Sequence, residues 1–286
     1  MTSWDQLEAE ALALVPAAAA DGVTLRVVGS AGIRLHCAGP AGLMDALGRP
    51  AKDIDFVVPQ GHRKGMRRFL EARGYVIDRD LLIAMEGRRY SFSHPGTGVD
   101  IDVFVERMEF CHTVEVAGRL DTHPVTICPD DLLLQKLQVI RMTTTDLLDS
   151  GVLLATHRVA GLPGGAGLPG GAGLPGGAGV PAGAEAGRAA GPVDCPAAID
   201  AIRIAGLMAR DWGFHHTATA NLARLQGAAA AETRFGPAAA ARIDERAGLL
   251  RAAIDAEPKS RGWRLRDRIG ERKQWWQDVD EKEATY

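Results

Sequence analysis

The chain has 286 residues, 46% of them hydrophobic and only 5% aromatic, which is enough for a sizeable and mainly aliphatic core. Its formal net charge of −3 argues against a protein that coats nucleic acid non-specifically, although a local basic groove remains compatible with it. The four cysteines form no Cys-x-x-Cys pair, so we expect reduced thiols rather than a disulfide framework. No signal peptide and no apolar run of bilayer length is present, which predicts a cytoplasmic protein without a membrane partner.

The first predicted elements are a helix over 4–20 and a short strand over 25–28. This strand runs into Gly29-Ser30 and a helix-compatible stretch, a turn that exposes backbone N–H groups favourable to phosphate, although such turns also serve as plain connections. We expect a loop over 39–50 and a basic amphipathic helix over 61–73. The basic face of that helix either is solvated or contacts a polyanion such as tRNA.

Two acidic doublets carry the strongest chemical signal. Asp53 and Asp55 lie in one strand-like run, and Asp100 and Asp102 lie in a second run that follows a predicted hairpin turn. Side chains two apart in a strand point to the same face, so each run places two carboxylates together. Such a patch is costly unless a proton or a divalent cation neutralises it, or unless the carboxylates face water or pair with Lys52 or an arginine. We interpret the doublets as a magnesium site for phosphoryl or nucleotidyl transfer.

The second half of the chain changes character. Helices are predicted from Pro129 to about Arg141 and from about Thr145, followed by Gly-Leu-Pro-Gly-Gly-Ala repeats that favour a flexible tether over a short collagen-like stalk. Four helices are then expected, the last a basic, Trp-bearing one over 261–276 that either contacts nucleic acid or packs its Trp residues on the domain. We therefore predict three parts: an α+β core over 1–158, a disordered linker or insertion over 159–195 and a helical region over 196–286.

Several segments together resemble the nucleotidyltransferase superfamily of the DNA polymerase β type. Within it, they look like an uncharacterised bacterial group often linked with AbiEii-type toxin nucleotidyltransferases. The resemblance covers roughly 23–158 and 196–226, and it is carried by Gly29-Ser30, Asp53-Ile54-Asp55, Asp102-Val103-Phe104, Glu109-Phe110-Cys111-His112-Thr113, 131–138, 146–149, 209–214 and 221–225. It implies a mixed-sheet nucleotidyltransferase core followed by helices.

The resemblance also implies roles for individual residues. Asp53, Asp55 and Asp102 would be the catalytic carboxylates and the ligands of Mg²⁺, with Asp100 as the rival for the third position. Three further residues would meet the phosphates of the nucleotide: Gly29, Ser30 and Lys136.

The expected activity is Mg²⁺-dependent transfer of a nucleoside monophosphate from a nucleoside triphosphate, expected to be ATP, to a hydroxyl. The acceptor is left open among a small molecule, tRNA and a protein. An antitoxin partner is suggested by analogy with the group only. The alternative is a catalytically inactive protein of the same fold that binds a nucleotide or a partner.

Overall fold

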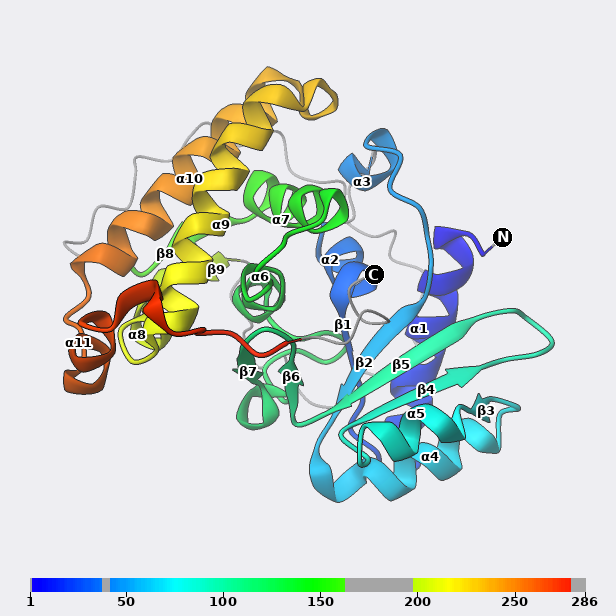
Figure 1. Ribbon diagram of the computed structural model, residues 1–286. Coiled ribbons are helices and arrows are strands. Elements are labelled where there is room, and N and C mark those ends of the chain that lie inside the picture. The colour runs from blue at the N-terminus through cyan, green and yellow to red at the C-terminus, as the bar shows by residue number, and fades with distance from the viewer. Residues whose placement is uncertain (1, 38–41, 163–197, 279–286) are drawn as a thin grey trace.

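The structure is a computed structural model that describes residues 2–37, 42–162 and 198–278. A five-stranded sheet in the order β1-β2-β5-β4-β3 forms its N-terminal part (Figure 1). Strands β2 and β5 are parallel, whereas the other neighbours are antiparallel. The strands are β1 (Arg26–Val28), β2 (Ile54–Val58), β3 (Val76–Ile77), β4 (Arg89–Ser93) and β5 (Asp100–Val105). The predicted α+β class with a mixed sheet and a helical C-terminal region is confirmed.

The two central strands are buried along most of their length, on both faces of the sheet. Ile54 and Phe56 of β2, like Ile101 and Val103 of β5, are fully buried on one face of the sheet. The aspartates fall on the opposite face, where each strand would otherwise present apolar side chains. The antiparallel pair β4–β5 confirms the predicted hairpin. The sheet thus has one ordinary hydrophobic face and one face that carries charge at its centre.

Helices cover the sheet and complete the N-terminal part (Figure 1). They are α1 (Trp4–Ala20), α2 (Gly29–His36), α3 (Leu43–Ala46), α4 (Arg63–Glu71) and α5 (Arg79–Ala84). Helix α1 begins after Ser3, whose side chain accepts a hydrogen bond from the Gln6 N–H, as an N-cap residue should. The predicted inner face of α4 is confirmed, because Met66, Phe69 and Leu70 are buried. Helix α3 lies in a segment that we expected to be a loop.

Six further helices are described after the five-stranded sheet. They are α6 (Pro129–Leu137), α7 (Thr144–Thr156), α8 (Ala201–Met208), α9 (Trp212–Ala231), α10 (Gly236–Ala256) and α11 (Arg261–Asp267). Two small sheets pair β6 (Arg107–Glu109) with β7 (Thr113–Glu115), and β8 (Arg158–Ala160) with β9 (Ala198–Asp200). Single turns of 3-10 helix complete the described elements, at Gln60–His62, Ala117–Arg119, Thr233–Phe235 and Gly270–Arg272. One hydrophobic cluster runs through both halves, so the helical region packs directly on the sheet-bearing part.

Three sequence predictions need correction. Residues 158–160 and 198–200 form paired strands, where we expected the linker to begin and a helix to start. The last predicted helix ends at Asp267 rather than continuing to Trp276. Cys128 is disulfide-bonded, so the expectation of reduced thiols is wrong for this residue. The glycine-rich repeats lie outside the described residues.

None of the helices in the described ranges combines the length and the apolar character that crossing a membrane requires.

Candidate functional site

The pairing of β2 with β5 brings the two acidic doublets together. Asp55 and Asp102 are direct partners in this parallel register, so their side chains share one face of the sheet. Asp53 lies immediately before β2 and, two residues from Asp55, belongs to the same face. Asp102 is buried, whereas Asp100 is exposed at the start of β5. The register therefore places Asp102, and not Asp100, beside Asp55.

A tight turn holds the start of α2 against this carboxylate cluster. Val28, the last residue of β1, is the antiparallel partner of Asp55, and α2 begins at the next residue. Gly29 has a φ of 62°, a conformation that side chains rarely adopt. A Cβ atom at Gly29 would lie 2.0 Å from Asp55 Oδ2, so only glycine permits this approach. The N-terminus of α2 consequently borders the acidic cluster.

Burial and mutual repulsion disturb the ionisation of the cluster. The pKa of Asp55 is raised well above its ordinary value, chiefly by burial and then by the neighbouring charges of Asp53 and Asp102. The pKa of Asp53 is also raised, again mainly by burial, with repulsion from Asp102 second. Lys136 and Arg89 oppose both shifts without cancelling them. Lys52 also lowers the pKa of Asp53, so burial and mutual repulsion together outweigh three nearby cations in raising these pKa values.

Asp102 has a partner of its own within the protein. The Arg89 Nη2 group donates a hydrogen bond of 2.7 Å to Asp102 Oδ2, and both side chains are buried. Arg89 comes from β4, opposite Phe104, and its guanidinium lies 5.1 Å from the centre of that ring. Nowhere in the described ranges do three or more His, Cys, Asp or Glu side chains gather closely enough to hold a metal ion. The three predicted ligands share a face, yet they are not assembled as a metal cage.

The predicted phosphate-binding residues also meet, next to the Gly29 turn. The Gly29 N–H donates to Gln135 Oε1 at 2.9 Å, and the Ser30 hydroxyl donates to Asp149 Oδ2 at 2.6 Å. Lys136 Nζ lies 3.0 Å from Asp149 Oδ2 and 3.1 Å from Asp146 Oδ1. Gly29, Ser30 and Lys136 are thus brought together as predicted, but each makes a polar contact with the protein itself.

Sequence reasoning missed the residues that organise this network. Arg49 reaches in from the segment before β2, where its Nε lies 2.9 Å from Asp149 Oδ1 and its Nη2 donates to the Ser30 hydroxyl at 2.7 Å. Asp146 and Asp149, one helical turn apart in α7, pair with Lys136 and Arg49. Asp146 also forms a capping box with Thr143 at the start of α7. The only sequence signal for the network was the pair of aspartates at helical spacing.

Comparison with known proteins adds little to this picture. No family model matches the chain, and no curated protein does. Among solved structures, it is similar to an antigenic nucleotidyltransferase-like protein from Paracoccidioides brasiliensis, with 16% sequence identity and a TM-score of 0.36. The matched part covers 55% of this chain and 79% of that one. A likeness this weak establishes neither a family nor an activity for the chain.

Proposed function

We propose that this protein is a nucleotidyltransferase that moves a nucleoside monophosphate from a nucleoside triphosphate, such as ATP, to a hydroxyl group of an acceptor. The observation that carries the proposal is the under-compensated acidic cluster of Asp53, Asp55 and Asp102, set against a glycine turn at a helix N-terminus. A helix N-terminus favours the phosphates, and the carboxylates favour a cation that accompanies them. The acceptor is a small molecule, a tRNA or a protein.

The donor set suits Mg²⁺ chemically. Carboxylate oxygens are hard ligands, and a positive charge bound among them would relieve the mutual repulsion that, after burial, raises the pKa values of Asp53 and Asp55. Bound there, Mg²⁺ would offset the charge that develops on the phosphate oxygens during transfer. Asp53, Asp55 and Asp102 are the residues that would hold it. Release of Asp102 from Arg89 is then part of the proposal, because that ion pair neutralises the third carboxylate.

Gly29, Ser30 and Lys136 would bind and orient the phosphates of the nucleotide. Gly29 keeps the α2 N-terminus within reach of the phosphates, since any side chain at this position would strike Asp55. Ser30 is held in place by Arg49 and Asp149, and so it presents a fixed hydroxyl at the same helix end. Lys136 contributes positive charge to the cluster from the α6 side. Orientation and charge compensation, rather than covalent chemistry, are what these residues supply.

One specific observation favours a second candidate. The buried ion pair between Arg89 and Asp102 fills a ligand position with a resident cation, as expected of a protein that binds a nucleotide or a partner without transferring anything. In that case the acidic cluster would keep its internal counter-charge permanently. The two candidate functions differ in whether the protein binds Mg²⁺ and in whether it transfers a nucleoside monophosphate to an acceptor.

Nucleotidyl transfer is tested by incubating the protein with α-labelled nucleoside triphosphates, Mg²⁺ and cell extract. We expect labelled product from the wild type, and about a hundredfold less from Asp53→Asn and Asp102→Asn, because each loses one ligand charge. Asp100→Asn is the matched control, since Asp100 is exposed two residues before Asp102, and it should label like the wild type. Equal labelling by all four proteins would refute the assignment. Absence of label despite tight nucleotide binding by the wild type would favour the second candidate.

A further inference from the structure

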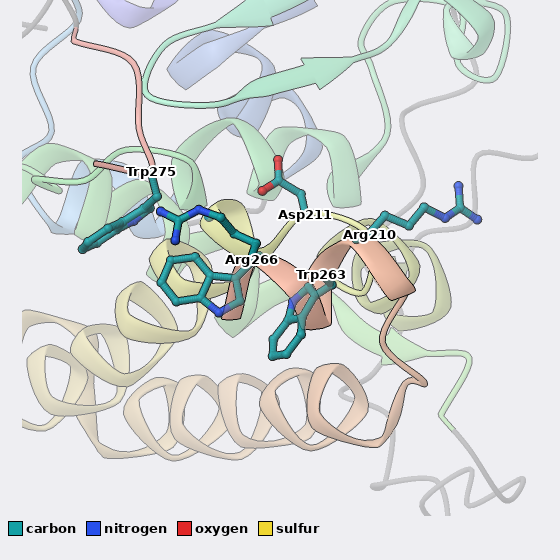
Figure 2. A pocket seen from close by; sticks show the side chains of 8 residues that line it. Arg210, Asp211, Trp263, Arg266 and Trp275 are labelled. Atoms are coloured by element: carbon teal, nitrogen blue, oxygen red, sulfur yellow. The ribbon is translucent and has the colours of Figure 1, made fainter. Parts of the chain in front are cut away.

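A cavity lies in the helical region, far along the chain from the acidic cluster. It encloses about 300 Å³, and it is lined by the connection between α8 and α9, by α11 and by Trp275 in the segment that follows. Figure 2 shows Trp263 and Arg266 projecting from α11, with Trp275 on the Arg266 side and Asp211 above them. The volume is at the lower end of the range for small-molecule sites, and it suits one nucleotide-sized group.

The walls of this pocket are aromatic and held in fixed orientations. Trp212 Nε1 donates to Asp267 Oδ1 at 2.7 Å, and Trp275 Nε1 donates to Thr217 Oγ1 at 3.1 Å. The Trp212 and Trp275 rings meet edge to face, with centroids 5.8 Å apart. A Cβ atom at Gly213 would lie 2.7 Å from the Trp275 carbonyl oxygen, so glycine is what allows the two walls to close on each other. The Trp212 ring is buried against His216 and Arg266, so the stacking area open to a ligand belongs to the half-buried Trp263 and Trp275 side chains, which are held at little entropic cost.

Positive charge accompanies these rings. The Arg266 guanidinium lies 4.6 Å from the centre of the Trp212 ring, and its two terminal nitrogens donate to the carbonyl oxygens of Gly270 and Lys273. Both terminal nitrogens thus bond carbonyl oxygens, and no ion pair of Arg266 with a carboxylate is found among the described residues. Arg210 stands at the rim and extends away from Arg266 (Figure 2). The 20-residue helix α9 begins at this pocket and adds the positive end of its dipole.

Two groups in the pocket fit hydrogen bonds to a base. Trp263 Nε1 is buried and has no acceptor among the described residues, although a buried donor ordinarily finds one. Asp211 accepts one hydrogen bond, from the Phe214 N–H, through a single oxygen, Oδ1. Its carboxylate is the one acidic group on the pocket wall, and it repels phosphate but accepts from an N–H of a nucleobase. Base and phosphate are thus matched by different parts of the same cavity.

We propose that this pocket binds a phosphorylated nucleoside, with the base against the Trp side chains and the phosphate near Arg266. The group could be supplied by a free nucleotide or by one unit of a single-stranded RNA. Exposed basic residues outside the lining follow one another on and after α11, where they would meet the neighbouring phosphates of a longer strand: Arg261, Arg264, Arg268, Arg272 and Lys273. The site does not depend on the proposed transferase activity.

Binding is measured by fluorescence anisotropy with a labelled nucleoside monophosphate and with a labelled single-stranded oligoribonucleotide, in EDTA so that no Mg²⁺ contributes. We expect saturable binding by the wild type and by Asp53→Asn alike. Arg266→Gln should weaken it about tenfold or more, because a charged contact to phosphate is lost. Arg264→Gln is the matched control, since Arg264 is exposed on the same helix without lining the pocket, and its mononucleotide binding should stay within about twofold of the wild type.

A second pair of variants tests the pocket without disturbing its packing. A Cβ atom at Gly262 meets only Ser260 Oγ, at 4.0 Å, so a side chain fits there and projects from the first turn of α11. Gly262→Glu adds a negative charge at a helix N-terminus, where it is compatible with folding, and it should weaken binding about tenfold more than Gly262→Gln of the same size. Circular dichroism checks that both variants are folded.

The two sources of the nucleotide give different patterns, and each supports the proposal. A free-nucleotide site binds both probes with similar affinity, whereas a strand-binding site prefers the oligoribonucleotide and shows a steeper salt dependence. Three results would overturn it: no saturable binding of either probe, displacement by inorganic phosphate as effective as by the mononucleotide, or equal loss of mononucleotide binding in Arg264→Gln and Arg266→Gln.

Discussion

Two clusters of charge share Lys136 as a neighbour and differ in how well their charges are compensated. In one, Asp53, Asp55 and Asp102 meet on the sheet, and burial with mutual repulsion raises the pKa of Asp53 and of Asp55. In the other, Asp149 lies between Lys136 and Arg49, and these cations hold its pKa below the ordinary value despite the burial that would raise it. Compensated charge stabilises a fold, whereas surplus charge costs stability and calls for a ligand.

The balanced cluster should give the largest effect on stability. Asp149 is completely buried, and Asp149→Asn removes the charge that Lys136 and Arg49 share. We expect a loss of about 3–5 kcal/mol in the free energy of unfolding, measured by urea denaturation. Glu71→Gln breaks the exposed pair with Arg67 and should cost no more than about 0.5 kcal/mol. A loss below about 1 kcal/mol in Asp149→Asn would remove the distinction between the clusters.

The contact between the Gly29 turn and the acidic cluster comes next in size. Gly29→Ala forces a side chain into a left-handed conformation and against Asp55, with an expected cost of about 2–3 kcal/mol. Gly22→Ala is the matched control, because Gly22 has a similar φ of 73° but no atom within 4 Å of the added Cβ, so that it should cost about 1 kcal/mol. Equal losses in thermal denaturation would show that the approach to Asp55 does not matter.

The surplus cluster should respond in the opposite direction. Without metal, Asp55→Asn is expected to raise the free energy of unfolding at pH 7 by about 1–2 kcal/mol, because it removes a repelled, buried charge. The pKa of Asp55 is higher in the folded than in the unfolded protein. Its carboxyl group therefore contributes fully to the free energy of unfolding below the unfolded pKa, and this contribution is lost as the pH rises through the folded pKa. The advantage of Asn over Asp should therefore grow with pH and vanish on acidification. A destabilised variant at pH 7 would show that Asp55 is already compensated.

Local sequence patterns predicted the parts of the site that depend on local geometry. Alternation put Asp53 and Asp55 on one face of a strand, and the hairpin turn delivered the second acidic run beside β4. Which of Asp100 and Asp102 lies beside Asp55 depended on register, and the pairing of β2 with β5 places Asp102 there. Whether two distant strands pair, and in which register, is a matter of tertiary packing, and a single sequence carries little information about it.

Internal counter-charges were the main element that the sequence did not disclose. Arg89 is an unremarkable strand residue in sequence, and Arg49 falls in a segment expected to be a loop, yet each neutralises an aspartate across the fold. Lys136 was predicted to meet phosphate, and it instead pairs with Asp146 and Asp149 in this structure. Such partners are chosen by three-dimensional proximity, since charged residues are too common for pairings to be deduced from spacing alone.

The central claim is that the surplus charge on the sheet belongs to a metal-assisted nucleotide site. Its most direct test is titration of the protein with Mn²⁺ in the presence of a non-hydrolysable nucleoside triphosphate, followed by electron paramagnetic resonance, in the wild type, in Asp55→Asn and in Asp100→Asn. We predict saturable Mn²⁺ binding that survives in Asp100→Asn and is lost in Asp55→Asn. Equal binding by Asp55→Asn and the wild type, or none by the wild type, would contradict the account.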